Sequence, residues 1–277
     1  MYHAKELGHN NFQFYNPTMN VRTSERFVLE NSLRRALKQN EFVLFYHPIF
    51  DLATQSLIGC EALLRWQELG RGLLLPSEFL PLIEASGLNV PINHWVLQEA
   101  CRQIKVWQSQ GLNTVPVAVN LSAAQFKRRD FLSSVTETLT NSGLDPHYLD
   151  LDLTESIVMG DAETAIGILR SLKEIGISIS VDDFGTGYSS LSHLRRFPID
   201  TLKINQSFVR DLTTDVDDAA ITAAIISMAK SLRLRVVAED VETKEQLDFL
   251  RGQGCDSVQG FYYYPALPAE EFARILV

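Results

Sequence analysis

The sequence predicts an α/β fold in which parallel strands close into a β/α barrel. Apolar runs of strand length alternate with helical segments over about 240 residues. Seven of these runs end in an acidic or amide residue, and the carboxyl ends of parallel strands share one face of a barrel. Within the runs, aliphatic residues alternate with small polar ones, which favours a closed barrel with a polar interior.

The seven runs have a strand-like body and a polar end. They are Leu57–Glu61, Val115–Asn120, Leu149–Glu155, Ile177–Asp183, Thr201–Asn205, Val236–Glu239 and Val258–Gln259. In the fourth run Ile177, Ile179 and Val181 share one face, and serines and an aspartate occupy the other. An open doubly wound sheet would need both faces apolar, so this alternation favours the barrel.

The remaining elements follow in order along the chain. An apolar stripe predicts a helix over Ser24–Gln39, followed by a strand over Phe42–Phe50. Further helices are expected at Pro76–Ala85, Ile92–Gln110, Phe131–Ser142, Ala162–Ile175, Ser189–Arg196, Asp217–Leu232, Lys244–Gly252 and Ala269–Ile275. Five glycines stand where helices should end: Gly87, Gly111, Gly143, Gly176 and Gly254.

Composition excludes several functional classes. The 277 residues carry a net charge of −9, which argues against binding to a nucleic acid polymer. The three cysteines lack metal-ligand spacing and suit a reducing, cytoplasmic compartment. No apolar run approaches the ~18 residues of a membrane span, so this segment is expected to make no membrane contact, although a longer parent protein could carry an anchor.

Polar residues at the strand ends predict a metal site. The candidate ligands are Glu61, Asn120, Asp152, Asp182, Asp183 and Glu239. Carboxylate and amide oxygens suit Mg²⁺ or Mn²⁺, and so many acids in one cavity require cations. Two ions would suit displacement at phosphorus, and Lys203 could contact the attacking water or a phosphate oxygen.

Several motifs resemble those of EAL domains, which are cyclic-di-GMP phosphodiesterases. They are Glu61-Ala62-Leu63-Leu64-Arg65, Val119-Asn120-Leu121-Ser122, Asp152-Leu153-Thr154-Glu155, Asp182-Asp183-Phe184-Gly185-Thr186-Gly187, Leu202-Lys203-Ile204 and Gln259-Gly260. The resemblance covers roughly residues 24–277. Residues 1–16 resemble the tail of a GGDEF domain, so we expect residues 1–22 to be such a tail with a linker and residues 23–277 to be the barrel.

The resemblance implies a modified (β/α)₈ TIM-like barrel with an antiparallel first strand. It implies hydrolysis of cyclic-di-GMP to linear pGpG with two Mg²⁺ or Mn²⁺ ions, and a homodimer. The catalytic residues would be Lys203, Glu239, Asp183 and Glu61. Those touching substrate would be Arg65, Leu64, Gln259 and Asp183. Glu155 and Glu242 would steady the loop Phe184–Ser190.

Three residues depart from the family pattern. Asp152 stands where Glu is usual and is one methylene shorter, while Asn205 replaces an aspartate and removes a charge. Asp240 replaces a glycine and would be strained if the backbone there requires positive φ. These departures leave a second reading open, a non-catalytic cyclic-di-GMP receptor. The third reading is a metal-dependent barrel enzyme that catalyses a different reaction.

Overall fold

The computed structural model describes residues 32–185 and 191–277. Predictions for residues 1–22, for the start of helix Ser24–Gln39 and for residues 186–190 therefore lie outside the described residues. The backbone divides into two compact units. The larger comprises residues 43–65 and 89–277, and the described part of the smaller comprises residues 32–42 and 66–88.

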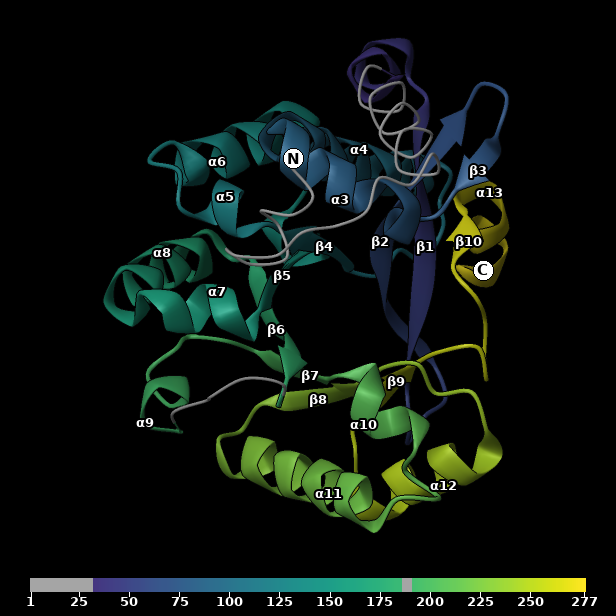
Figure 1. Ribbon diagram of the computed structural model, residues 1–277, viewed down its shortest axis with the longest axis vertical. Coiled ribbons are helices and arrows are strands. Elements are labelled where there is room, and N and C mark those ends of the chain that lie inside the picture. Colours follow the sequence, from purple (N-terminus) through teal and green to yellow (C-terminus); the bar gives the residue numbers. More distant parts are fainter. Residues whose placement is uncertain (1–31, 186–190) are drawn as a thin grey trace, which may run out of the picture. The chain divides into compact units, whose positions relative to one another are not determined.

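Eight strands form the barrel of the larger unit (Figure 1). Their order is β1-β9-β8-β7-β6-β5-β4-β2, and β2 pairs back with β1. The strands are β1 (Phe42–Asp51), β2 (Leu57–Glu68), β4 (Val117–Leu121), β5 (Leu149–Thr154), β6 (Ser178–Phe184), β7 (Thr201–Ile204), β8 (Arg235–Ala238) and β9 (Ser257–Gln259). Neighbours from β2 to β9 are parallel, whereas β1 is antiparallel to β9, with Ile49 opposite Gln259. The modified barrel with an antiparallel first strand is confirmed.

Helices surround this barrel (Figure 1), and the residues that they bury are mostly apolar. The long ones are α4 (Asn89–Ser109), α6 (Phe131–Ser142), α8 (Ala162–Ile175), α11 (Val216–Ser231) and α12 (Lys244–Gln253). Each lies within three residues of its predicted bounds. The five glycines expected after helices all have positive φ, as left-handed helix ends require.

Several short elements were not predicted. They are η1 (Pro146–Tyr148), α5 (Ala123–Phe126), α7 (Glu155–Gly160), α10 (Gln206–Arg210) and β10 (Leu267–Pro268). Three of them begin at or just after a polar strand end, because residues such as Ser122 and Asn205 also cap a helix. The predicted helix Ser189–Arg196 is represented by α9 (Leu191–Leu194).

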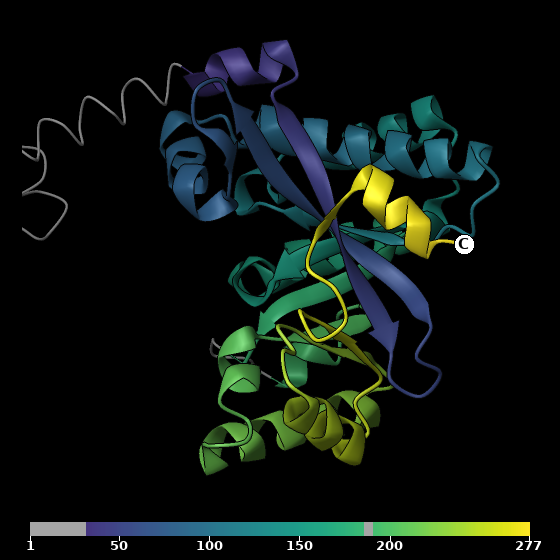
Figure 2. The same cartoon turned by 90° about the vertical axis from the view of Figure 1, so that its right-hand side faces the viewer.

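The C-terminal segment packs beside β1, as Figure 2 shows. It consists of α13 (Ala269–Phe272) followed by the 3₁₀ helix η2 (Ala273–Ile275), which together match the predicted helix. The Phe272 ring is fully buried, with its centroid 5.7 Å from that of Tyr46 and 5.2 Å from that of Trp107. These aromatic contacts hold the end of the chain against the barrel.

The smaller unit has an aromatic core of its own. Residues 32–39 are helical, and β3 (Gly72–Leu74) and α3 (Pro76–Ser86) complete its described part. The Trp66 and Phe79 rings meet edge-on at 6.0 Å, and Phe42 lies 6.0 Å from Trp66. The indole of Trp66 donates to the buried carboxylate of Glu41 at 3.0 Å, which satisfies both polar groups.

The alternation predicted for the strands is confirmed. Ile177, Ile179 and Val181 are fully buried under the helices. The opposite faces of β5 to β7 line an interior cavity of about 70 Å³ with Asp150, Ser180, Lys203 and other polar residues. The cysteines are free and buried, and none of the helices in residues 32–185 and 191–277 combines the length and apolarity that a membrane crossing needs.

Candidate functional site

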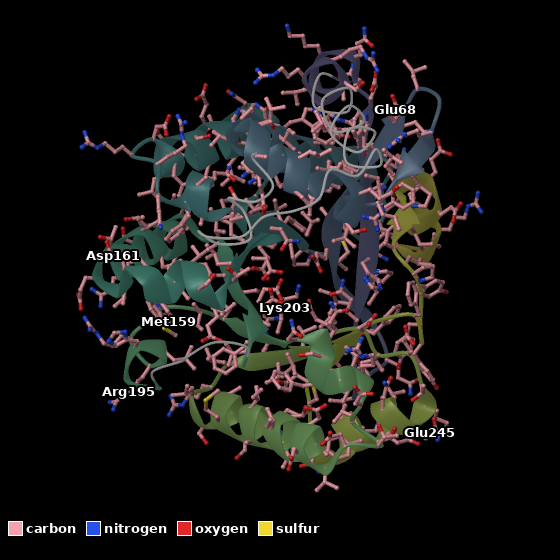
Figure 3. All side chains as sticks on the ribbon, in the orientation of Figure 1. Glu68, Met159, Asp161, Arg195, Lys203 and Glu245 are labelled. Atoms are coloured by element: carbon pink, nitrogen blue, oxygen red, sulfur yellow. The ribbon has the colours of Figure 1, made fainter. Side chains whose placement is uncertain are left out.

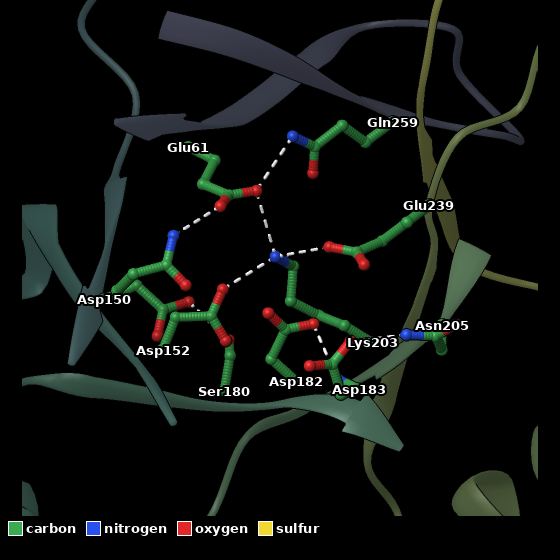
Figure 4. Close-up of polar contacts among 11 residues, drawn as sticks. Glu61, Asp150, Asp152, Ser180, Asp182, Asp183, Lys203, Asn205, Glu239 and Gln259 are labelled. Carbon is green, nitrogen blue, oxygen red and sulfur yellow. Dashed lines mark hydrogen bonds and ion pairs between the residues drawn. The ribbon is translucent and has the colours of Figure 1, made fainter. Parts of the chain in front are cut away.

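The polar strand ends converge inside the barrel around one lysine (Figure 4). Lys203, on β7, is 1% exposed and is labelled within the ring of strands in Figure 3. Its ammonium lies 2.6 Å from Glu239, 2.7 Å from Asp152 and 3.1 Å from Glu61. The structure therefore brings together residues from β2, β5, β7 and the end of β8 that lie far apart in the chain.

Glu61 is the most heavily bonded of these carboxylates. Its Oε1 accepts from the Asn120 amide at 2.6 Å, and its Oε2 accepts from the Gln259 amide at 3.0 Å and from Lys203. Burial works to raise the pKa of Glu61, but Lys203 and the two amides outweigh it and lower that pKa. Glu61 is thus held as an anion.

The other acids differ from Glu61 in their electrostatics. Burial raises the pKa of Asp152 well above its ordinary value and that of Glu239 to about 8, although Lys203 opposes both shifts. Burial also raises the pKa of Asp182, and neighbouring carboxylates add to it. The same carboxylates raise the pKa of Lys203 despite its own burial, so the lysine is a permanent cation.

The Asp182-Asp183 pair lies at an irregularity near the end of β6. The pairing of β6 with β7 shifts register between Val181 and Phe184, and Asp183 has φ +56°. A bulge of this kind changes the direction of the backbone between two adjacent carboxylates. The Asp183 N–H donates to Asp182 at 2.7 Å, and the Asn205 amide donates to Asp183 at 2.5 Å.

Asp240 follows β8 in a backbone conformation that favours glycine. Its φ is +57°, so the strain expected for aspartate at this position is present, at a cost of about 1 kcal/mol. Nearby, a Cβ at Gly260 would lie 2.2 Å from the Val241 carbonyl oxygen, so that position excludes other residues. The close approach anchors Gln259 beside Glu61.

Two of the expected substrate residues, Leu64 and Arg65, follow Glu61 on β2. Arg65 is half-buried, with its guanidinium carbon 5.5 Å from the centre of the Phe45 ring and Nη1 donating to the Leu64 carbonyl at 2.9 Å. The Leu64 side chain is half-buried and takes no part in the polar cluster of Figure 4.

The two expected loop residues differ in their surroundings. Glu155 is buried and accepts from the Gly185 N–H at 3.1 Å, which anchors the described start of the loop. Residues 186–190 of that loop lie outside the described residues. Glu242 has an exposed side chain, and its backbone N–H donates to Gln246 at 2.8 Å.

The polar layer beneath Lys203 was not singled out from the sequence as part of the site. The Ser180 hydroxyl donates to Asp150 at 2.7 Å, and the other oxygen of Asp150 is buried without a hydrogen-bond partner. Strand alternation was the available signal, since these residues share a face with Asp152 and Asp182.

The donor set suits a divalent cation. Asp152 and Gln259 each keep one buried oxygen without a hydrogen-bond partner, and both oxygens are hard ligands. Within the part of the chain that the structure describes, no three His, Cys, Asp or Glu side chains are arranged to hold a metal directly. Lys203 accounts for this, because three carboxylates turn toward its ammonium.

Known proteins resemble this chain in sequence and in fold. The model of the EAL domain family matches residues 30–266. The bifunctional diguanylate cyclase/cyclic di-GMP phosphodiesterase MucR of Pseudomonas aeruginosa is 45% identical over 271 residues, covering 98% of this chain and 40% of MucR. The cyclic di-GMP phosphodiesterase NbdA of the same organism is 41% identical over 277 residues, covering 99% of this chain and 35% of NbdA. The chain thus spans well under half the length of these relatives.

Solved structures of EAL proteins have the same fold as this chain. A MucR phosphodiesterase structure in complex with c-di-GMP superimposes with a TM-score of 0.85 at 46% identity, covering 87% of this chain and 98% of that one. The EAL enzyme Bd1971, bound to cAMP and cyclic-di-GMP, gives a TM-score of 0.86 at 33% identity, covering 92% of this chain and 70% of that one.

Proposed function

The chain belongs to the EAL domain family, and on that premise we propose that it hydrolyses cyclic-di-GMP to linear pGpG. The observation that carries the proposal is the cluster of carboxylates and Lys203 at the C-terminal ends of the barrel strands. MucR and NbdA, both named as phosphodiesterases of this nucleotide, support the choice of substrate.

Charge balance supports two divalent cations. Glu61, Asp152 and Glu239 contact the ammonium of Lys203, and Asp182 and Asp183 lie on the neighbouring strand β6. These five carboxylates and the one ammonium leave four negative charges when all are ionised. Two Mg²⁺ or Mn²⁺ ions would neutralise them. We assign Glu61, Asn120, Asp152 and Asp182 to one ion, and Asp182, Asp183 and Glu239 to the second. Bound there, the ions would supply charge stabilisation to a phosphoryl group.

The chain's own residues position the reactants. The permanent ammonium of Lys203 orients the attacking water and stabilises negative charge on the phosphate oxygens. The guanidinium of Arg65 binds substrate phosphate at the rim. Gln259, fixed by the close approach of Gly260 to Val241, holds the adjoining edge of the substrate, with Leu64 beside it.

A cyclic-di-GMP receptor without turnover is the second candidate. The specific observation is the amide of Asn205, which donates to Asp183 at 2.5 Å. An amide in this position satisfies the Asp183 carboxylate without a cation, so the second ion is bound less strongly than it would be with an aspartate at 205. Nucleotide binding would survive this change more readily than hydrolysis.

The deciding experiment incubates the purified chain with cyclic-di-GMP and Mn²⁺ or Mg²⁺ and separates the products by chromatography. Formation of pGpG, abolished by Glu61→Ala and retained in the exposed control Glu245→Ala, is the expected result. Binding in Ca²⁺ without product in Mn²⁺ would make the chain a receptor. Turnover that survives Glu61→Ala would refute the metal assignment.

We also propose a wider context for this chain. Residues 1–22 form the tail of an upstream GGDEF-like domain and a linker, and residues 23–277 form the catalytic barrel. The parent protein acts in the cytoplasm, with or without a membrane anchor elsewhere, and its barrels pair as a homodimer.

A further inference from the structure

Three exposed leucines mark the β2–β3 hairpin of the smaller unit. We call Leu69, Leu73 and Leu75 the hairpin leucines, and their exposed fractions are 72%, 41% and 50%. The register places Leu74 opposite Trp66, and Leu74 is 5% exposed. Strand alternation therefore turns Leu74 into the core of this unit and Leu73 away from it. An apolar group displayed in this way is typical of an interaction surface.

Leu75 also opposes the local preference of the backbone. It is the N-cap of α3, where Ser, Thr, Asp or Asn is favoured because the side-chain oxygen accepts from a free N–H of the first turn. A leucine has no such oxygen. The Leu75 backbone exchanges hydrogen bonds with Glu78, since its N–H donates to the Glu78 carboxylate at 2.9 Å and its carbonyl accepts from the Glu78 N–H at 3.0 Å, but its side chain accepts none. A residue that weakens its own helix and exposes apolar surface indicates a role outside the unit.

The chain enters this unit beside the hairpin. The entry helix is residues 32–39, and Arg35 lies 3.7 Å from Glu68, the last residue of β2 (labelled in Figure 3). The Gln67 N–H also donates to the Glu41 carbonyl at 2.7 Å. The described part of this helix is about 12 Å long, so residue 32 lies close to the hairpin. Tethering at millimolar effective concentration lets a small patch bind.

We propose that the hairpin leucines are the docking surface for the domain that precedes this chain in its parent protein. The chain covers 40% of MucR and 35% of NbdA, so most of each relative lies outside the matched segment. The preceding domain is covalently connected to this unit through the entry helix. It would present an apolar face to the hairpin. The inference concerns domain arrangement and stands apart from the proposed catalytic activity.

Thiol labelling tests the docking directly. The natural cysteines Cys60, Cys101 and Cys255 are buried, so an introduced surface thiol dominates the reaction with a maleimide. Leu69→Cys and Leu73→Cys would be made in the 277-residue chain and in the full-length parent, with the exposed Glu245→Cys as the matched control. We expect labelling of the two hairpin thiols to be roughly tenfold slower in the parent and that of Glu245→Cys to be unchanged.

A second variant separates docking from folding. Leu75→Ser supplies the missing cap and should raise the melting temperature of the 277-residue chain by about 2 °C. In the parent the same change should speed labelling of Leu73→Cys. Equal labelling rates in chain and parent would overturn the proposal. Labelling that slows as the concentration of the 277-residue chain rises would also overturn it, by identifying a second copy as the occupant.

Discussion

The side-chain amide of Asn205 donates to the Asp183 carboxylate at 2.5 Å and so joins the ends of β7 and β6. The amide oxygen of Asn205 accepts from the Ser207 N–H at 2.8 Å and caps α10. One residue thus completes a helix and holds a proposed metal ligand. An aspartate at 205 could do the first but could not donate to Asp183 unless it were protonated.

We therefore expect Asn205→Asp to strengthen binding of the second cation. The added charge beside Asp183 should lower the Mn²⁺ concentration for half-maximal hydrolysis by about tenfold. Without a divalent cation, the same variant should melt at a lower temperature than the parent sequence, because two carboxylates then face each other. Asn205→Ser keeps a capping oxygen without the charge and serves as the control. An unchanged Mn²⁺ dependence in Asn205→Asp would show that this position does not act on the ion.

Asp152→Glu should raise turnover. Asp152 is 1% exposed, with one oxygen 2.7 Å from Lys203 and the other without a hydrogen-bond partner. One more methylene would extend the carboxylate toward the cation, and we expect a gain of about tenfold in kcat with Mn²⁺. The longer side chain must also fit a packed site, so circular dichroism and melting should accompany the assay. No gain in a well-folded variant would mean that the shorter acid already reaches its ligand position.

Lys203→Met should make the fold depend on divalent cations. Removal of the ammonium leaves Glu61, Asp152 and Glu239 without their shared positive partner, at a cost of about 3–5 kcal/mol in the presence of a chelator. Mn²⁺ should then raise the melting temperature more in Lys203→Met than in the parent sequence. Lys244→Met, which removes an exposed ion pair with Asp248, should show no such difference. Equal Mn²⁺ shifts in both variants would count against a metal site among these acids.

The sequence predicted which residues lie at the strand ends better than it predicted their contacts. Strand alternation and the shared end of parallel strands predicted that Glu61, Asp152 and Glu239 lie in one cavity. Which atoms touch could not be predicted, because it depends on rotamers and on the shear of a closed barrel. The three ion pairs that Lys203 makes with carboxylates are contacts of this kind, and the sequence did not predict them.

Short elements escaped prediction for a related reason. A stretch such as Gln206–Arg210 is too short for helical periodicity, and Asn205 was interpreted only as a strand end although it also caps α10. The bulge at Asp183 depends on the register between β6 and β7, which no local pattern specifies. Conversely, the strain at Asp240 was foreseeable, because a single substitution at a glycine position reveals it.

Asp150→Asn should change how stability depends on pH. Burial raises the pKa of Asp150 to about 6 from an ordinary value of 3.8, so between these values the folded chain binds a proton that the unfolded chain releases. Stability therefore falls as pH rises from about 4 to 6 and stays low above 6. Asparagine can still accept from Ser180 without the buried charge, and we expect it to stabilise the chain at pH 7.5 by about 1–2 kcal/mol and to make no gain at pH 4.

Urea unfolding across this pH range, with a chelator present, would measure the effect of Asp150→Asn. The raised pKa of Glu239 affects both proteins alike, so only the difference between the two curves is interpreted. That difference includes the smaller effect of Asp150 on the pKa of Asp152. Asp248→Asn, at an exposed position on α12, should leave the curve unchanged. If the curves of Asp150→Asn and the parent sequence ran parallel from pH 4 to 7.5, the buried carboxyl would not titrate in this range and the stabilising effect would have another cause.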